Sequence, residues 1–218
     1  MRKGELTRER IIAQAAPLFN QRGFAGCSMQ DVMDATGLEK GGLYRHFSSK
    51  EELATEVFRY AVARVNQLRA EKIDHAHGAL AELRSTVRRF VEIRSDVAGG
   101  CIIFNTAIEQ DDGNPVLRNM ALKAIDDWKA RLGKVVEHGI RHGEIRKGTI
   151  PRRVANVLIS TLEGALTISR MEGTRTALED AQHTLDAFLD SLRAPSVTKA
   201  LSSKPHRAVA PATRPHLP

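Results

Sequence analysis

Apolar residues recur at spacings of three and four positions along almost the whole chain, as far as about residue 193. This period places them on one face of an α-helix, and no sustained alternation of apolar and polar residues predicts a strand. The sequence therefore predicts an all-α fold. The expected helices span about 7–22, 28–37, 40–47, 49–72, 79–96, 101–110, 115–142, 152–172 and 176–193.

Polar residues indicate where the first helices begin. Thr7 is a candidate N-cap of the first helix. Ser28 and Asp31 have the spacing of a capping box, in which each side chain bonds to the other residue's backbone N–H, and they predict the start of a second helix. In that helix Val32 and Ala35 are expected to face inward.

The segment GLEKGGLYRHF, residues 37–47, contains two adjacent glycines beside or within a predicted helix. Each glycine costs about 1 kcal/mol relative to alanine in a helix interior, so either this is a loop or something approaches the backbone closely there. A short helix, a turn at Gly37 and a second helix from about Lys40 have the spacing of a helix-turn-helix. Leu43 and Phe47 lie one turn apart and would anchor that second helix in the core.

In a helix-turn-helix, the second helix lies in the DNA major groove and its N-terminal end meets phosphates and base edges. Small residues there let the backbone approach the DNA, and exposed N–H groups favour a phosphate oxygen. The alternative is that GGLY is only a turn and the charged residues form a solvated face. The candidate DNA-binding residues are Ser28, Gln30, Lys40, Gly41, Gly42, Tyr44, Arg45, His46 and Lys50.

From Thr7 to Leu53 the sequence resembles the N-terminal domain of TetR/AcrR-family transcriptional regulators. The matching segments are RIIAQAAPLFNQRGF, CSMQDVMDATG and GLEKGGLYRHFSSKEEL. The resemblance implies a three-helix DNA-binding domain that a fourth helix joins to a helical ligand-binding and dimerisation domain. Glu39 and Gly42 depart from the family, which often has hydroxyl residues there that contact phosphates. Cys27 replaces a common Thr and is expected to be a packing residue.

The second domain is similar to one subgroup of that family in the segments GGCIIFNTAIEQDDGNPVLR and LISTLEGALTISR. There the resemblance implies small-molecule sensing. A few polar or aromatic side chains within the apolar helices are candidates to line an apolar pocket with polar anchors, with ordinary core packing as the alternative for each. These candidate effector-binding residues are Cys101, Phe104, Asn105, Trp128 and Glu163.

Two late helices are candidates for a dimer interface. Residues 155–168 are apolar nearly all round their helix, so that helix must be covered on more than one side. In the last helix apolar residues spaced 3, 4, 3 and 4 apart form a seam typical of helix-on-helix packing. We expect a four-helix interface between two chains, with an intramolecular core as the alternative. The candidate interface residues are Leu158, Leu162, Leu178, Leu185, Phe188 and Leu192.

The formal net charge of +7 lies at the two ends of the chain. Residues 1–50 carry eight Lys or Arg and five Asp or Glu, and residues 194–218 carry four basic residues and no acidic one, so residues 51–193 are neutral overall. The last segment also holds five of the eight prolines. We therefore expect residues 194–218 to form a disordered, basic, proline-rich tail, with a contribution to DNA binding as a lesser alternative.

Several classes of protein are excluded by what the sequence lacks. The two cysteines match no disulfide or zinc pattern, and no apolar run is long enough for a membrane span or a signal peptide, which favours a cytoplasmic protein. The sequence contains no GxSxG, P-loop or HExxH motif, so none of these motifs indicates an enzyme here. His138 and His142 have metal-ligand spacing, but nothing completes a set, so neither a metal nor another cofactor is expected.

The sequence thus predicts a helix-turn-helix DNA-binding domain at residues 1–48 and a helical effector-binding and dimerisation domain at residues 49–193, whose linking helix is 49–72. The expected function is that of a homodimeric regulator, a repressor that a small apolar ligand releases from a palindromic double-stranded operator. The alternative is a helical interaction protein with a degenerate DNA-binding head.

Overall fold

The computed structural model describes residues 3–71, 73, 75, 77–93 and 97–195. Within these residues the chain is helical, and the only pairing of strand type is an isolated bridge between Ile145 and Arg193. The predicted all-α fold is confirmed. Its helices are α1 (Lys3–Gly26), α2 (Met29–Thr36), α3 (Lys40–Tyr44), α4 (Lys50–Ala70), α5 (Ala79–Glu92), α6 (Ile102–Glu109), α7 (Pro115–Arg141), α8 (Pro151–Glu172) and α9 (Thr176–Ser191).

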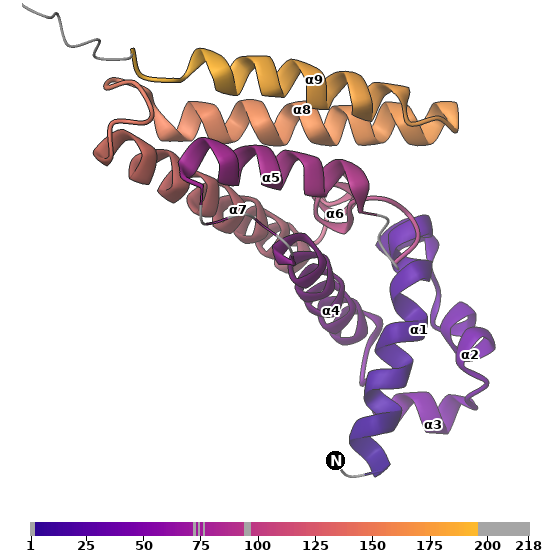
Figure 1. Cartoon of the computed structure of the whole chain (residues 1–218). Coiled ribbons are helices and arrows are strands. Elements are labelled where there is room, and N and C mark those ends of the chain that lie inside the picture. Colours follow the sequence, from indigo (N-terminus) through magenta and orange to yellow (C-terminus); the bar gives the residue numbers. More distant parts are fainter. Residues whose placement is uncertain (1–2, 72, 74, 76, 94–96, 196–218) are drawn as a thin grey trace, which may run out of the picture.

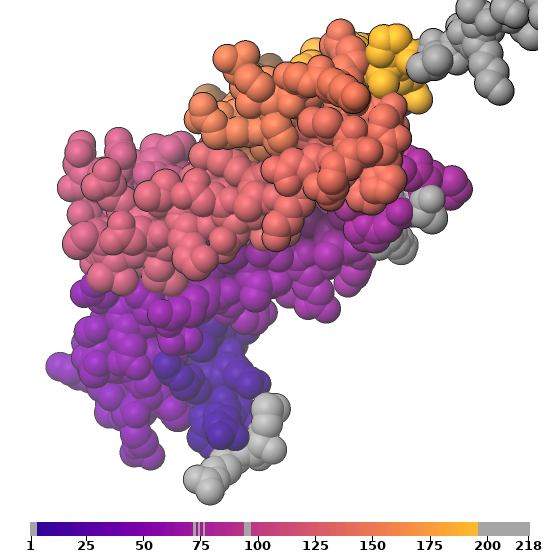
Figure 2. Space-filling model, turned by 90° about the vertical axis from the view of Figure 1, so that its left-hand side faces the viewer, coloured from indigo at the N-terminus to yellow at the C-terminus, as the bar shows by residue number. Residues whose placement is uncertain are grey.

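The helices form a small head and a larger bundle. Helices α1, α2 and α3 make up the head at one end of the molecule, whereas α5, α7, α8 and α9 form the bundle at the other, and α4 and α6 lie between them (Figure 1). The space-filling view shows the same division, with the indigo and purple head below the orange and yellow helices (Figure 2). The head is thus held at a distance from the far end of the bundle.

The first helix is longer than its sequence predicted. Because α1 begins at Lys3, Thr7 lies inside it, and the prediction that Thr7 is its N-cap is wrong. Gly23 has a φ of 77° and a ψ of 172°, so the helical geometry is interrupted where the sequence predicted an end. A φ in this range favours glycine, since a side chain is strained there. The chain turns at Gly23 and continues towards α2.

The second helix begins as predicted, with a different inward face. The Ser28 side chain accepts a hydrogen bond from the backbone N–H of Asp31, and the Asp31 carboxylate accepts one from the Ser28 N–H, which completes the capping box. Val32 is buried, but Ala35 is exposed, and Thr36 is buried in its place. The two inward-facing residues, Val32 and Thr36, are four positions apart and not three, so the prediction that Ala35 faces inward is wrong.

Two clusters of buried side chains hold the chain together. One joins α5, α7, α8 and α9, and contains Trp128. The other contains Leu43 and Phe47, both fully buried as predicted, and it extends from the head into Ile103 of α6 and Leu117 of α7. The core of the head is therefore continuous with two helices that lie beyond residue 48 in the sequence.

The six candidate dimer residues lie in the core of the single chain. Five are buried and Phe188 packs partly buried against the same cluster, where α9 contacts α5 and α8 of its own chain. A side chain buried within one chain has little surface left for a partner, so these residues do not fit the predicted contact role: Leu158, Leu162, Leu178, Leu185, Phe188 and Leu192. The pairing of two chains itself stays a prediction.

Candidate nucleic-acid interface and effector cavities

The start of α3 has two glycines that the chain's own packing does not require. The helix begins after Glu39, and the backbone N–H of Gly42 donates to the Glu39 carbonyl at 2.9 Å. A Cβ added at Gly41 would meet nothing within 4 Å, and one at Gly42 would meet only Leu38, at an ordinary 3.7 Å. The helix-propensity cost of both glycines therefore has no compensation inside the described chain.

Several candidate DNA-contacting side chains lie on the outer surface of the head. Lys40, Tyr44 and Arg45 are exposed, and the Lys40 ammonium lies 6.0 Å from the centre of the Tyr44 ring. The Lys50 ammonium lies 4.4 Å over the ring of Phe24, so Lys50 is placed by α1 as well as by α4. His46 is half-buried. The outward group at α3 thus consists of two cations and a phenol.

The candidates from α2 are already engaged in hydrogen bonds. The Ser28 hydroxyl donates to an Asp31 carboxylate oxygen at 2.6 Å, and the Gln30 amide donates to Asp34 at 2.7 Å. The hydrogen bonds from Ser28 lower the pKa of Asp31 to about 2. The Ser28 and Gln30 side chains therefore bond within their own helix. A DNA contact would have to use their remaining hydrogen-bonding groups.

Arg8, which no sequence pattern singled out, joins α1, the end of α3 and α4. Its guanidinium lies 4.3 Å over the Phe47 ring and donates to the His46 carbonyl at 3.4 Å. It also lies 3.6 Å from the carboxylates of Glu52 and Glu56 on α4. These contacts fix the end of α3 against α1 and α4, and so fix the direction in which α3 points.

The predicted effector residues divide between two cavities of the second domain. Cys101, Phe104, Asn105 and Glu163 line a cavity of about 280 Å³ between α6 and α8. Trp128 lines a larger cavity of about 490 Å³ between α4, α5, α7 and α8. The fold thus brings four of the five candidates together and places Trp128 in a different cavity.

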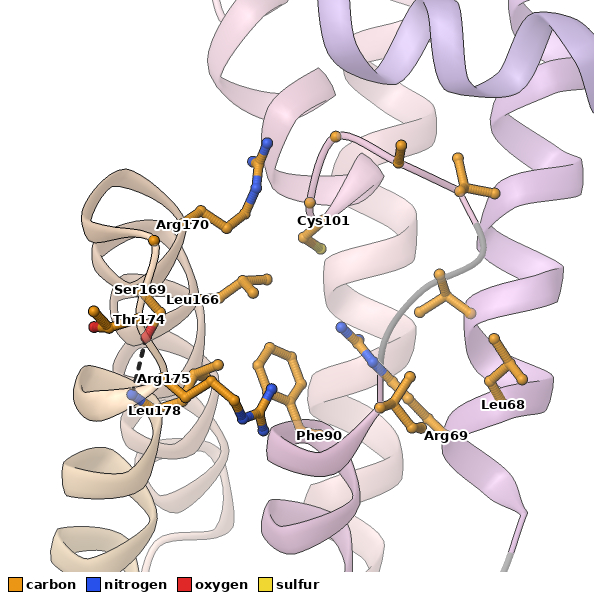
Figure 3. A pocket seen from close by; sticks show the side chains of 17 residues that line it. Leu68, Arg69, Phe90, Cys101, Leu166, Ser169, Arg170, Thr174, Arg175 and Leu178 are labelled. Carbon is orange, nitrogen blue, oxygen red and sulfur yellow. Dashed lines mark hydrogen bonds between the residues drawn. The ribbon is translucent and has the colours of Figure 1, made fainter.

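Arg69, which no sequence pattern singled out, lines the larger of these cavities and pairs with Glu163, which lines the smaller one. Its guanidinium carbon is 4.5 Å from the ring centres of both Phe90 and Trp128. One of its nitrogens is 3.7 Å from the buried carboxylate of Glu163. Figure 3 shows Arg69 and Phe90 on one side of a third cavity, of about 380 Å³, with Cys101 at its other end.

Burial raises the pKa of two ionisable groups in this region. It raises the pKa of Glu163, against the opposing effects of the Cys101 thiol and Arg69. Burial, with the charge of Glu163, raises the pKa of the Cys101 thiol to about 12. Cys101 is therefore a thiol and not a reactive thiolate, and both cysteines are free in the structure.

A hydrogen-bond network joins the cavities to the head. The Asn105 amide donates to Asn20 Oδ1 at 2.9 Å and to the Gly99 carbonyl at 2.8 Å. The Asn20 amide in turn donates to the carbonyls of Ala98 and Gly100 at 3.0 and 3.1 Å. Because residues 98–100 also line the third cavity, α1 is bonded directly to a cavity wall.

A second contact joins α6 to the head. The Glu109 carboxylate accepts hydrogen bonds from the backbone N–H groups of Phe24 and Ala25, each at 2.8 Å. These residues follow the turn at Gly23, so α6 holds the end of α1, which leads to α2. The position of α6 and the orientation of the head are therefore linked.

Within the described residues no group of three His, Cys, Asp or Glu side chains is arranged to hold a metal ion. His138 and His142 are exposed, and the His138 carbonyl lies 2.9 Å from a ring nitrogen of His142. None of the described helices has the length and apolar character that crossing a membrane requires. Nearly all of the predicted tail, residues 196–218, lies outside the described residues.

The third helix of the three-helix head is short and exposed, and a separate helical domain is bonded to that head. These features define the class of helix-turn-helix DNA-binding regulators. Residues 11–57 match the family model for bacterial regulatory proteins of the tetR family, and residues 78–185 match that for the tetracyclin repressor-like C-terminal domain. The chain belongs to the TetR family of transcriptional regulators.

Three relatives illustrate the similarity. A TetR transcriptional regulator from Chloroflexus aurantiacus J-10-FL, of known structure, is 42% identical; the match covers 89% of this chain and 100% of that one, with a TM-score of 0.85. A TetR-family regulator from Cytophaga hutchinsonii is 30% identical, covers 88% and 98% of the two chains, and has a TM-score of 0.80. The HTH-type transcriptional repressor DhaR of Mycobacterium sp. (strain GP1) is 26% identical over 173 residues, 79% of this chain and 86% of that protein.

These comparisons confirm the predicted family, and the relatives are transcriptional regulators and not enzymes. The three-helix head is confirmed with it. The individual DNA contacts, the dimer and the effector stay predictions.

Proposed function

We propose that this protein is a homodimeric cytoplasmic repressor that binds a palindromic operator and is released from it by a small apolar ligand. The observation that carries the proposal is the N-terminal end of α3, where Gly41 and Gly42 leave the backbone open beside Lys40 and Tyr44. An exposed helix start without side chains lets a phosphate oxygen reach the backbone N–H groups. The similarity to the repressor DhaR supports the direction of regulation.

Pairing of two chains is proposed through the exposed face of α8. Val157, Ile168 and Met171 are 41%, 49% and 85% exposed, and their spacing places them on one face together with Gly164, whose added Cβ would meet nothing within 4 Å. Apolar side chains around a glycine suit close packing of two such helices about a two-fold axis. A two-fold dimer would present two α3 helices to half-sites roughly 34 to 36 Å apart.

Release is proposed to follow from the contacts between the cavities and the head. A ligand that binds one arrangement of α4 and α6 better than the other shifts the population towards it. Asn105 and Glu109 would carry that shift to α1, while α4, which begins directly after the head, would swing and change the spacing of the two α3 helices. A few kcal/mol of coupling suffices, because about 1.4 kcal/mol changes an affinity tenfold.

A gel-shift assay with the DNA upstream of the protein's own operon tests the proposal. The native chain is expected to bind at low salt, and Tyr44→Ala to bind about tenfold more weakly or worse, because the exposed phenol at α3 is lost. Tyr60→Ala is the matched control, since Tyr60 is 38% exposed on α4 against 42% for Tyr44 on α3. No binding by the native chain, or equal binding by the two variants, would favour the helical interaction protein with a degenerate head.

Replacing Asn105 by alanine is expected to leave DNA affinity nearly unchanged and to reduce ligand-induced release by about fivefold or more, because the side chain's bonds to Asn20 and Gly99 disappear. The measurement is the operator dissociation constant with and without a compound that releases the native protein. Leu122→Ala, at a 54% exposed position of α7 outside the linings of these cavities, is the control and should respond like the native chain. A full response in Asn105→Ala would refute this route of coupling.

A further inference from the structure

The largest of these three cavities, whose lining includes Arg69, has an apolar wall and a cationic edge. Its apolar lining comes from α5, α7 and α8, and includes Val87, Trp128, Leu132, Leu158 and Leu162. Its volume of about 490 Å³ lies within the range of sites that bury a small organic molecule. The ligand that fits this lining therefore has a substantial apolar body.

The charged lining of this cavity is mostly basic. Arg69, Arg131 and Lys134 contribute positive charge. The acidic side chain of the lining, Glu82, lies 3.0 Å from a ring nitrogen of His75 and so has a neighbour of its own. Among the described lining residues the basic groups thus outnumber the acidic one.

The guanidinium of Arg69 has no carboxylate at hydrogen-bonding distance in its ion pair. Its side chain is only 18% exposed and lies 4.5 Å from the ring centres of Phe90 and Trp128. Its ion pair with Glu163 spans 3.7 Å, too long for a hydrogen bond. Burial, which raises the pKa of Glu163, also weakens that carboxyl group as a counter-charge. An oxyanion in the cavity would satisfy donors that Glu163 does not reach.

Arg131 adds a second guanidinium to the same space. It donates a hydrogen bond to Asn66 at 3.2 Å, one turn of α4 before Arg69. Burial and the charge of Arg69 lower the pKa of Arg131, although Asp127 opposes them. Two like charges that disfavour each other are both relieved by an anion placed between them. Guanidinium groups match the geometry of a carboxylate, with two parallel N–H donors.

We infer that the cavity lined by Arg69, Arg131 and Trp128 binds an apolar carboxylate, whose anionic head lies at the two arginines and whose body packs against the apolar wall. This names the effector class of the function proposed above and rests on it. A neutral apolar molecule would bring no counter-charge to the two arginines, and a cationic one would be repelled by them.

Trp128 makes occupancy measurable, because it is the chain's only tryptophan and lines the cavity. The full-length protein is titrated with decanoate and with 1-decanol, an uncharged probe of the same chain length, below the concentration at which decanoate forms micelles. Decanoate is expected to change Trp128 fluorescence saturably, with a dissociation constant about tenfold or more below that of 1-decanol. It is also expected to weaken operator binding in the gel-shift assay.

Arg131→Gln is the test variant, because Arg131 is exposed at the cavity edge and glutamine can keep a bond to Asn66. It should raise the dissociation constant of decanoate by about tenfold or more and leave that of 1-decanol unchanged. Lys129→Gln removes the same charge from the same helix outside the cavity lining, and should bind decanoate like the native chain.

Three results would overturn the inference. They are equal dissociation constants for decanoate and 1-decanol, equal losses in Arg131→Gln and Lys129→Gln, and decanoate binding that leaves operator affinity unchanged. Failure of the proposed function would look different, since the ligand-free protein would then not bind the operator at all.

Discussion

Replacing Gly42 by leucine is expected to stabilise the free protein while weakening its binding to DNA about tenfold or more. The gain in stability, up to about 1 kcal/mol, follows from the poor helix propensity of glycine. Space is available, because an added Cβ at Gly42 meets only Leu38, at 3.7 Å. The loss of affinity follows if the backbone of α3 must lie close to a phosphate. A variant that is more stable than the native chain yet binds DNA more weakly would show that Gly42 serves the DNA contact and not the fold.

Gly42→Thr is the matched comparison for this position. Threonine also adds a Cβ, but it supplies a hydroxyl that can donate to a phosphate oxygen, so this variant should bind DNA as tightly as the native chain or more tightly. Thermal unfolding measures the stability of each variant, and gel-shift titration of the operator at fixed salt measures its affinity. Equal affinities for the leucine and threonine variants would refute the role assigned to the glycine.

Truncating Phe47 to alanine is expected to destabilise the head by about 3 to 5 kcal/mol and to abolish DNA binding, because a fully buried ring is replaced by a cavity. The ring also supports the guanidinium of Arg8, which bonds to the end of α3 and lies beside α4. Losing the Phe47 ring removes the side chain that holds α3 in the core and the surface on which the Arg8 guanidinium lies. The measurement is chemical unfolding followed by circular dichroism, together with gel shift.

Trp128 reports separately on the second domain, since it belongs to the other core cluster. In Phe47→Ala its fluorescence transition should shift less than the helical signal, because the lesion lies in the cluster of the head. Phe188→Ala is the control: that ring is only partly buried on α9, and its loss should leave operator binding intact. Retained DNA binding in Phe47→Ala would contradict the role of Phe47 as the anchor of α3.

Local patterns predicted the parts of the structure that local interactions determine. The capping box at Ser28, the turn at Gly37 and the burial of Leu43 and Phe47 each depend on residues a few positions apart. Residue type and spacing are enough to reveal such features. The helix bounds were predicted to within a few residues for the same reason, with Thr7 as an exception.

Long-range contacts were beyond the reach of those patterns. Arg8 and Arg69 look like ordinary surface cations in the sequence, since the groups that give them roles are far away in the chain: His46 for one, Glu163 for the other. The seam of α9 shows the same limit, because apolar spacing reveals that a helix packs against something without revealing which chain supplies the partner. Burial within one chain decided that question for Leu185.

The continuity of the head's core with α6 and α7 bears on how such regulators can be recombined. A transferred segment of residues 1–48 would lack Ile103 and Leu117, which belong to its hydrophobic core. It would also lack the Glu109 carboxylate, which accepts a hydrogen bond from Phe24. A chimera that grafts these residues onto another regulator would therefore inherit operator specificity only if the host's sixth and seventh helices present a matching surface. In this protein the segments to transfer together are the head and the helices that it packs against, α6 and α7.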